Sequence, residues 1–193
     1  MKNTLNNIPI VSMKRGQDWA AWLKKNHAAS PGIWMRFYKK DAGAVSITHA
    51  EALDEALCYG WIDGQLQKYD EQSWLQKFTP RRAKSIWSKK NAERALQLIK
   101  LGRMKPAGLN EIEKAKADGR WERAYDSPAK MTFPDDFLKE LSKDKKALNF
   151  FESLNKANKY AIAWRLQTAK KPETKEKRMR QILEMLSQGK KFH

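Results

Sequence analysis

A basic stretch, FTPRRAKSIWSKKNAER at residues 78–94, has the residue types of an anion-binding site. Pro80 favours an extended chain before it, which leaves an arginine pair in a loop that leads into a predicted helix. Fork-shaped guanidinium groups and the free amides of a helix start both attract an oxyanion. We therefore predict a site with Ser85 as the N-cap of the helix and Trp87 as an apolar wall. Its residues are Arg81, Arg82, Lys84, Ser85, Trp87 and Lys89.

The same residues also have a purely structural interpretation. Arg81 and Arg82 could instead pair with acidic side chains of residues 51–71, or lie on a solvated surface. Trp87 could belong to the core, because most of the eight Trp residues fall in apolar stripes.

An acidic group lies in the first half of the chain, and its members are Glu51, Asp54, Glu55, Asp63, Asp70 and Glu71. Carboxylates suit hard cations such as iron, magnesium or calcium. No loop has the ligand spacing of a calcium site, and the three His are scattered at positions 27, 49 and 193. A solvated or arginine-paired acidic face therefore competes with a metal site.

The sequence contains none of the common motifs for nucleophilic, nucleotide-binding or zinc-dependent enzymes. The single cysteine, Cys58, has no neighbouring His and lies beside the apolar face of a predicted helix, so we expect a buried thiol. We interpret the chain as a non-enzymatic protein without a cofactor.

The net charge of +17 is concentrated in two blocks. Residues 76–105 carry ten basic side chains against Glu93 alone, and residues 154–193 carry eleven against three acidic ones. Such blocks attract nucleic acid or other anionic partners, although they also serve solubility. No apolar run is long enough for an integral membrane segment, the first residues lack the apolar core of a signal peptide, and one cysteine suits a reducing compartment. We expect a cytoplasmic protein, of an oligomeric state that the sequence leaves open.

Apolar periodicity predicts the elements that position these groups. We expect a helix over residues 17–26, a strand over 32–40, and a helix that begins at a capping box of Thr48 and Glu51 and ends at Gly60. A hairpin follows, with strands on both sides of Glu71 and Gln72. Residues 1–80 are therefore predicted to form an α+β subregion, a small antiparallel sheet with packed helices.

Residues 81–193 have the periodicity of a mainly helical subregion. Its predicted apolar stripes include Ala92, Ala95, Leu96 and Ile99, and then Tyr160, Ala161 and Trp164. Helices of marginal hydrophobicity gain stability from packing, so we expect this half to share the core of the first. Residues 1–193 are predicted to be a single domain.

Four segments carry a family resemblance: EALDEALCYGWIDG (51–64), FTPRRAKSIWSKKNAER (78–94), GRMKPAGL (102–109) and AIAWRLQTAKKPETKEKR (161–178). In these segments the chain resembles the YdeI/OmpD-associated family, also described as bacteriocin-protection proteins, within a broader YdhG-like group. The resemblance implies an α+β fold and a bacterial stress or envelope-defence setting, and it carries over no catalytic residue.

We therefore expect a cytoplasmic stress or bacteriocin-protection protein whose basic segments bind an anionic partner, either nucleic acid or a phosphorylated ligand. The resemblance also implies an alternative, because some YdhG-like proteins are described as frataxin-like iron chaperones. In that alternative the iron ligands are Glu51, Glu55, Asp63 and Asp70.

Overall fold

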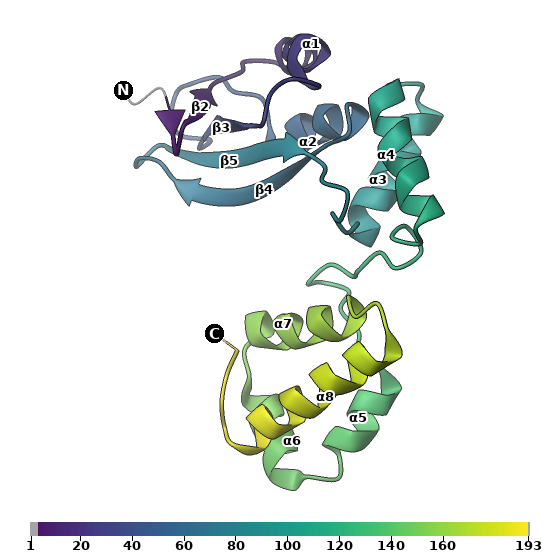
Figure 1. Cartoon of the computed structure of the whole chain (residues 1–193). Coiled ribbons are helices and arrows are strands. Elements are labelled where there is room, and N and C mark those ends of the chain that lie inside the picture. Colours follow the sequence, from purple (N-terminus) through teal and green to yellow (C-terminus); the bar gives the residue numbers. More distant parts are fainter. Residues whose placement is uncertain (1–3, 193) are drawn as a thin grey trace. The chain divides into compact units, whose positions relative to one another are not determined.

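The computed structural model describes residues 4–192 (Figure 1). By the clustering of its internal contacts the chain divides into two compact units. The first comprises the chain up to Ser85 together with Glu93–Gly119, and the second comprises Ile86–Ala92 and the chain from Arg120 onward. The single domain over residues 1–193, in which both units would unfold together, stays a prediction.

A five-stranded sheet forms the centre of the first unit, with the strand order β1-β2-β3-β5-β4. Its strands are β1 Thr4–Leu5, β2 Ile8–Val11, β3 Ile33–Tyr38, β4 Trp61–Lys68 and β5 Ser73–Pro80. The α+β class, the strand within residues 32–40 and the hairpin are confirmed. The purely antiparallel sheet is wrong, because helix α1 (Gly16–Asn26) lies between β2 and β3 in the chain and these two strands pair in parallel.

The first unit also contains helices α1, α2 (His49–Cys58) and α4 (Pro106–Ala117), together with residues 93–100 of α3 (Lys89–Lys100). The predicted capping box is present, since the Glu51 amide donates to the Thr48 hydroxyl at 3.2 Å and the Thr48 amide donates to the Glu51 carboxylate at 2.9 Å. Trp19 of α1 donates from Nε1 to the Ala52 carbonyl at 3.0 Å, and its ring centroid lies 5.8 Å from that of Phe78. This buried tryptophan therefore joins α1, α2 and the sheet.

Helix α3 (Lys89–Lys100) begins three residues later than predicted. The Ser88 hydroxyl accepts from the Asn91 amide at 3.2 Å, so Ser88 occupies the capping position and the prediction of Ser85 as N-cap is wrong. The predicted apolar stripe is also only partly buried, because Leu96 is 50% exposed and Leu98 is buried in its place.

Four helices form most of the second unit: α5 Asp135–Leu141, α6 Lys145–Ser153, α7 Lys156–Gln167 and α8 Pro172–Ser187 (Figure 1). Their core consists of Phe137, Leu141, Ala147, Phe151, Leu154, Ile162, Leu166, Ile182 and Leu186. Helix α7 contributes Ile162 and Leu166 to it, so the predicted inward stripe of Tyr160, Ala161 and Trp164 is wrong. Within residues 4–192 no helix has the length and apolar character to span a membrane.

Candidate functional site

The first part of the predicted anion site, Arg81 to Ser85, belongs to the first unit. Arg81 is only 8% exposed, and its amide donates to the Gly60 carbonyl at 3.0 Å. The side chains of Arg82 and Lys84 are exposed. Ser85 accepts from the Arg82 amide at 3.0 Å, which closes a short turn in place of the expected helix cap. Arg82 and Lys84 are therefore the cations of this loop that an anion could reach.

The remaining residues of the predicted site, Trp87 and Lys89, belong to the second unit. Trp87 is 2% exposed, and its ring centroid lies 4.9 Å from that of Trp121. Lys89 forms a 2.7 Å ion pair with Asp126. The burial of Trp87 favours its interpretation as a core residue, since it presents no ring face to a ligand. Anion binding by the loop stays a prediction.

The four carboxylates of the iron alternative each have a different partner. The partners are Thr48 for Glu51, Arg103 for Glu55 at 2.7 Å, His49 for Asp63 at 3.1 Å and Arg36 for Asp70 at 2.6 Å. No three His, Cys, Asp or Glu side chains gather into a possible metal site in the part of the chain that the structure describes. Iron binding stays a prediction. An anaerobic titration with ferrous iron tests it, because a Glu55→Gln and Asp63→Asn double variant should bind iron more weakly than the wild type.

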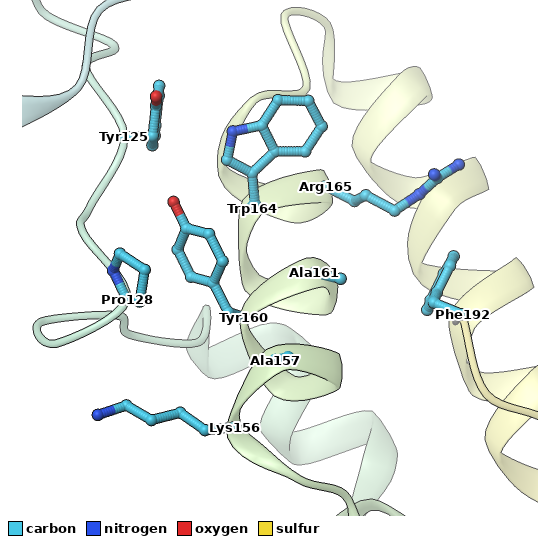
Figure 2. Close-up of a pocket in the computed structure, with 9 residues that line it drawn as sticks. All are labelled: Tyr125, Pro128, Lys156, Ala157, Tyr160, Ala161, Trp164, Arg165 and Phe192. Carbon is cyan, nitrogen blue, oxygen red and sulfur yellow. The ribbon is translucent and has the colours of Figure 1, made fainter. Parts of the chain in front are cut away.

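A groove with a volume of about 850 Å³ runs along α7 in the second unit (Figure 2). It is lined by Tyr125, Pro128, Lys156, Ala157, Tyr160, Ala161, Trp164, Arg165 and Phe192. Its size falls within the range of small-molecule sites, which is about 300–1,000 Å³. Most of the lining is apolar or aromatic, with one cation near each end of the helical face. The groove is the candidate functional site.

The sequence of α7 explains this lining, because residues four apart lie on one helical face. Lys156, Tyr160 and Trp164 form one row, and Ala157, Ala161 and Arg165 form the next. The small alanines leave space between the larger side chains. Figure 2 shows the tyrosine and tryptophan rings on one side of the alanines and Phe192 on the other. The two rows therefore produce a channel along the helix surface.

The aromatic rings of the groove hold one another in place. The ring centroids of Tyr125 and Trp164 lie 6.3 Å apart in an edge-to-face arrangement at 79°, and Trp164 remains 37% exposed. The Arg165 guanidinium lies 4.9 Å from the centroid of the Phe192 ring. Neither Lys156 nor Arg165 forms an ion pair with a residue in the range 4–192. An exposed ring and two unneutralised cations thus line the same groove.

A network around Asp126 fixes the loop that carries Tyr125 and Pro128. The Asp126 carboxylate accepts from Gln167 at 2.8 Å, from Thr132 at 3.1 Å and from Lys89 at 2.7 Å. Burial alone would raise the pKa of Asp126, but these hydrogen bonds outweigh it and hold the pKa below its ordinary value. The residue is therefore an anion that ties the loop to α7.

Tyr160 lies between this network and the groove. Its hydroxyl donates to the Asp126 carbonyl at 3.2 Å, which fixes the ring beside Pro128. Burial raises the pKa of Tyr160, so the phenol stays neutral in the physiological range. The groove wall therefore carries no negative charge at this position that would repel an anion.

The sequence interpretation missed this groove. It assigned Tyr160, Ala161 and Trp164 to the core and gave no role to Tyr125, Pro128, Lys156, Arg165 and Phe192. One signal was present, because a lysine, a tyrosine and a tryptophan recur every four residues from Lys156 within a strongly basic block. The contribution of Tyr125 and Phe192 depends on tertiary structure and has no local signal.

The two halves of the chain match different families. Residues 11–111, more than half of the chain, match a domain of unknown function (DUF8412), and residues 130–189 match the family described as bacteriocin-protection, YdeI or OmpD-associated. No curated protein and no solved structure matches the chain. The YdhG-like placement stays a prediction, whereas the YdeI/OmpD-associated resemblance is confirmed. The chain therefore belongs to the family of the DUF8412 domain, and its α5–α8 region is similar to the YdeI/OmpD-associated bacteriocin-protection family.

Proposed function

We propose that this chain is a non-enzymatic, cytoplasmic bacteriocin-protection protein that acts by binding an anionic partner. The observation that carries the proposal is the groove on α7, where aromatic rings line one surface with two cations that have no carboxylate partner among residues 4–192. The groove favours single-stranded nucleic acid as the partner, because unpaired bases stack on exposed rings while the backbone phosphates meet basic side chains.

Charge supports an anionic partner. The groove lies mostly in the segment of residues 154–193, which has eleven basic and three acidic side chains. A surface with this excess attracts polyanions over a distance of about 10 Å at moderate salt. The region therefore combines long-range attraction of a polyanion with an exposed Trp164 ring on which a base can stack.

The geometry favours a single strand over a duplex. Lys156 and Trp164 are eight residues apart on α7, which corresponds to about 12 Å along the helix axis. A cation and a stacking face at this spacing suit a splayed strand, whose bases are free to leave the backbone. In a duplex the base faces are covered by their neighbours, so Trp164 would have no ring to stack on.

Fluorescence anisotropy with a labelled oligothymidylate tests the proposal at two salt concentrations. For a single strand the logarithm of the binding constant falls with the logarithm of salt by about 0.7 per phosphate contact. Replacing one contacting cation, as in Arg165→Gln, should therefore lower the slope by about 0.7. Arg180→Gln is the matched control, because Arg180 is an exposed arginine of α8 outside the groove lining.

Three competitors complete the experiment: a duplex, a small phosphorylated ligand and a vesicle of anionic lipid. We expect the single strand to bind most tightly and the groove variants to weaken it selectively. Tighter binding of vesicles or of duplex, unaffected by Trp164→Ala, would reject the groove as a base-binding site. Absence of binding to every polyanion at low salt would reject the anionic partner altogether.

A further inference from the structure

A second cavity, in the first unit and apart from the groove, lies at the N-terminus of α4. Its volume is about 390 Å³, and its lining consists of Lys24, His27, Tyr59, Lys105, Pro106 and Ala107. These residues come from the end of α1, the end of α2 and the start of α4. The lining contains two lysines and no carboxylate.

The start of α4 is held tightly against the end of α2. The Lys105 amide donates to the Cys58 carbonyl at 3.1 Å. A Cβ atom on Gly108 would lie 2.5 Å from the same carbonyl oxygen, so the two backbones approach as closely as a glycine permits. The first turn of α4 therefore has a fixed position beside Tyr59.

This helix start has amide donors without an acceptor among the residues that the structure describes. Lys105 is the N-cap of α4 and its side chain makes no capping hydrogen bond. Pro106 has no amide hydrogen, and the amides of Ala107 and Gly108 have no acceptor among residues 4–192. Unsatisfied amides at the positive end of a helix dipole form a natural position for an oxyanion.

Tyr59 provides an independent indication of a ligand. The residue is 8% exposed, yet its hydroxyl has no hydrogen-bond partner in the described chain. Tyr59 lines the cavity, and its hydroxyl oxygen is not among the polar atoms of the described residues that are sealed from solvent. Burial, and after it the charge of Glu55, raises the pKa of Tyr59, so the phenol keeps its proton as a donor. The ring is buried while the hydroxyl stays a donor that a ligand or water can reach.

The charged and aromatic residues around the cavity also suit an anion. Lys24 and Lys105 are exposed and form no ion pair in the described part of the chain. The nearby carboxylate of Glu55 is already paired with Arg103 at 2.7 Å. His27 donates from Nδ1 to the Leu23 carbonyl at 2.9 Å, and its ring packs on Tyr59 at a centroid distance of 5.3 Å. The rings form a wall beside the cations.

We propose that this cavity binds a phosphate group, held by two lysines, a tyrosine hydroxyl and the first amides of α4. The volume exceeds that of a bare phosphate ion, and the His27 and Tyr59 rings provide a surface for a small organic body. The ligand is therefore a small phosphate monoester in preference to inorganic phosphate.

Amide chemical shifts of the full chain, recorded by NMR, test this proposal. Inorganic phosphate and glycerol phosphate are titrated separately at constant ionic strength, with chloride as the reference anion. We expect both to shift the Ala107 and Gly108 amides, with glycerol phosphate binding more tightly. If inorganic phosphate binds equally well, the organic body contributes nothing and that part of the proposal is wrong.

Two variants identify the residues that hold the ligand. Tyr59→Phe removes only the hydroxyl and keeps the buried ring, and Lys24→Gln removes one charge at the surface. Each should weaken phosphate about tenfold, the loss expected for one hydrogen bond to a charged group. Lys25→Gln is the matched control, because Lys25 is exposed on the same helix outside the cavity. Two results would overturn the proposal. Either the chemical shifts of the Ala107 and Gly108 amides do not change at tens of millimolar phosphate, or all three variants bind phosphate with equal affinity.

Discussion

Truncation of Trp164 separates binding from stability in the α7 groove. Trp164 is 37% exposed and touches Tyr125 edge to face, so Trp164→Ala loses only part of a tryptophan's burial. We expect a loss of about 1–2 kcal/mol in the free energy of unfolding. A stacked base contributes about 1–3 kcal/mol, so the dissociation constant for a single strand should rise about 5- to 150-fold.

Truncation of Trp87 should give the opposite result. Trp87 is 2% exposed and packs on Trp121, and a core tryptophan changed to alanine costs about 3–5 kcal/mol. This is a large fraction of a typical total stability of about 5–15 kcal/mol, so Trp87→Phe serves as a second variant should the alanine variant fail to fold. The folded fraction of either variant should bind oligothymidylate with the affinity of the wild type.

Urea unfolding followed by circular dichroism gives the stabilities, and anisotropy gives the affinities. Leu138→Ala controls for the loss of an exposed apolar side chain, because Leu138 is 43% exposed on α5 outside the groove lining. Trp164→Phe keeps a ring face and should retain most of the affinity. Two results would refute the assignment of base stacking to Trp164. Either Trp164→Ala binds oligothymidylate as tightly as the wild type, or Trp87→Phe loses as much affinity as Trp164→Ala.

Four further predictions follow from the structure. Burial raises the pKa of Cys58 to about 11, so Ellman's reagent at pH 8 should react far more slowly with the folded protein than with the protein in urea. The pKa of Asp126 is lowered, so the stability that its carboxylate contributes is complete above about pH 4 and is lost as the pH falls through the folded-state pKa. Asp126→Asn should therefore lower the free energy of unfolding by about 1–3 kcal/mol at pH 7, measured by urea unfolding. Arg82→Ala should change the unfolding free energy by no more than about 1 kcal/mol and weaken oligothymidylate binding if the 81–85 loop contacts the partner, which melts and anisotropy of the same sample measure. Limited proteolysis should leave no separately stable fragments if residues 1–193 form one cooperative domain, and two stable products cut near residues 125–135 would contradict it.

The first unit was predicted well where the signals are local. The Thr48 and Glu51 capping box lies within four residues, and Gly60 after α2 adopts the left-handed conformation expected of a helix end, with φ of 74°. The parallel pairing of β2 with β3 was not predictable in the same way. Strands β1 and β2 have two and four residues, too few to show a period, and their pairing depends on the path through α1.

The start of α3 shows how tertiary contacts decide between equivalent local signals. Ser85 and Ser88 both precede the apolar stripe and either could cap a helix. In the structure Ser88 pairs with Tyr125 in an isolated bridge, and the Lys89 amide donates to the Tyr125 carbonyl at 2.9 Å. The chain is therefore extended through Ser88, and the helix begins only after it. No feature of residues 78–94 alone indicates that Tyr125 would be the partner.

Helix α7 shows why periodicity found the residues of the groove and gave them the wrong role. Periodicity identifies which side chains share a face, but it does not say which face meets the rest of the protein. Tyr160 and Trp164 form one apolar row, and Ile162 and Leu166 form another, so α7 has more apolar surface than one core face requires. Only the row of Ile162 and Leu166 joins the core. The remaining row leaves an aromatic surface partly in contact with solvent. A surplus apolar row beside Lys156 and Arg165 is therefore itself the sequence sign of a binding face, and substitutions there should change affinity more than stability.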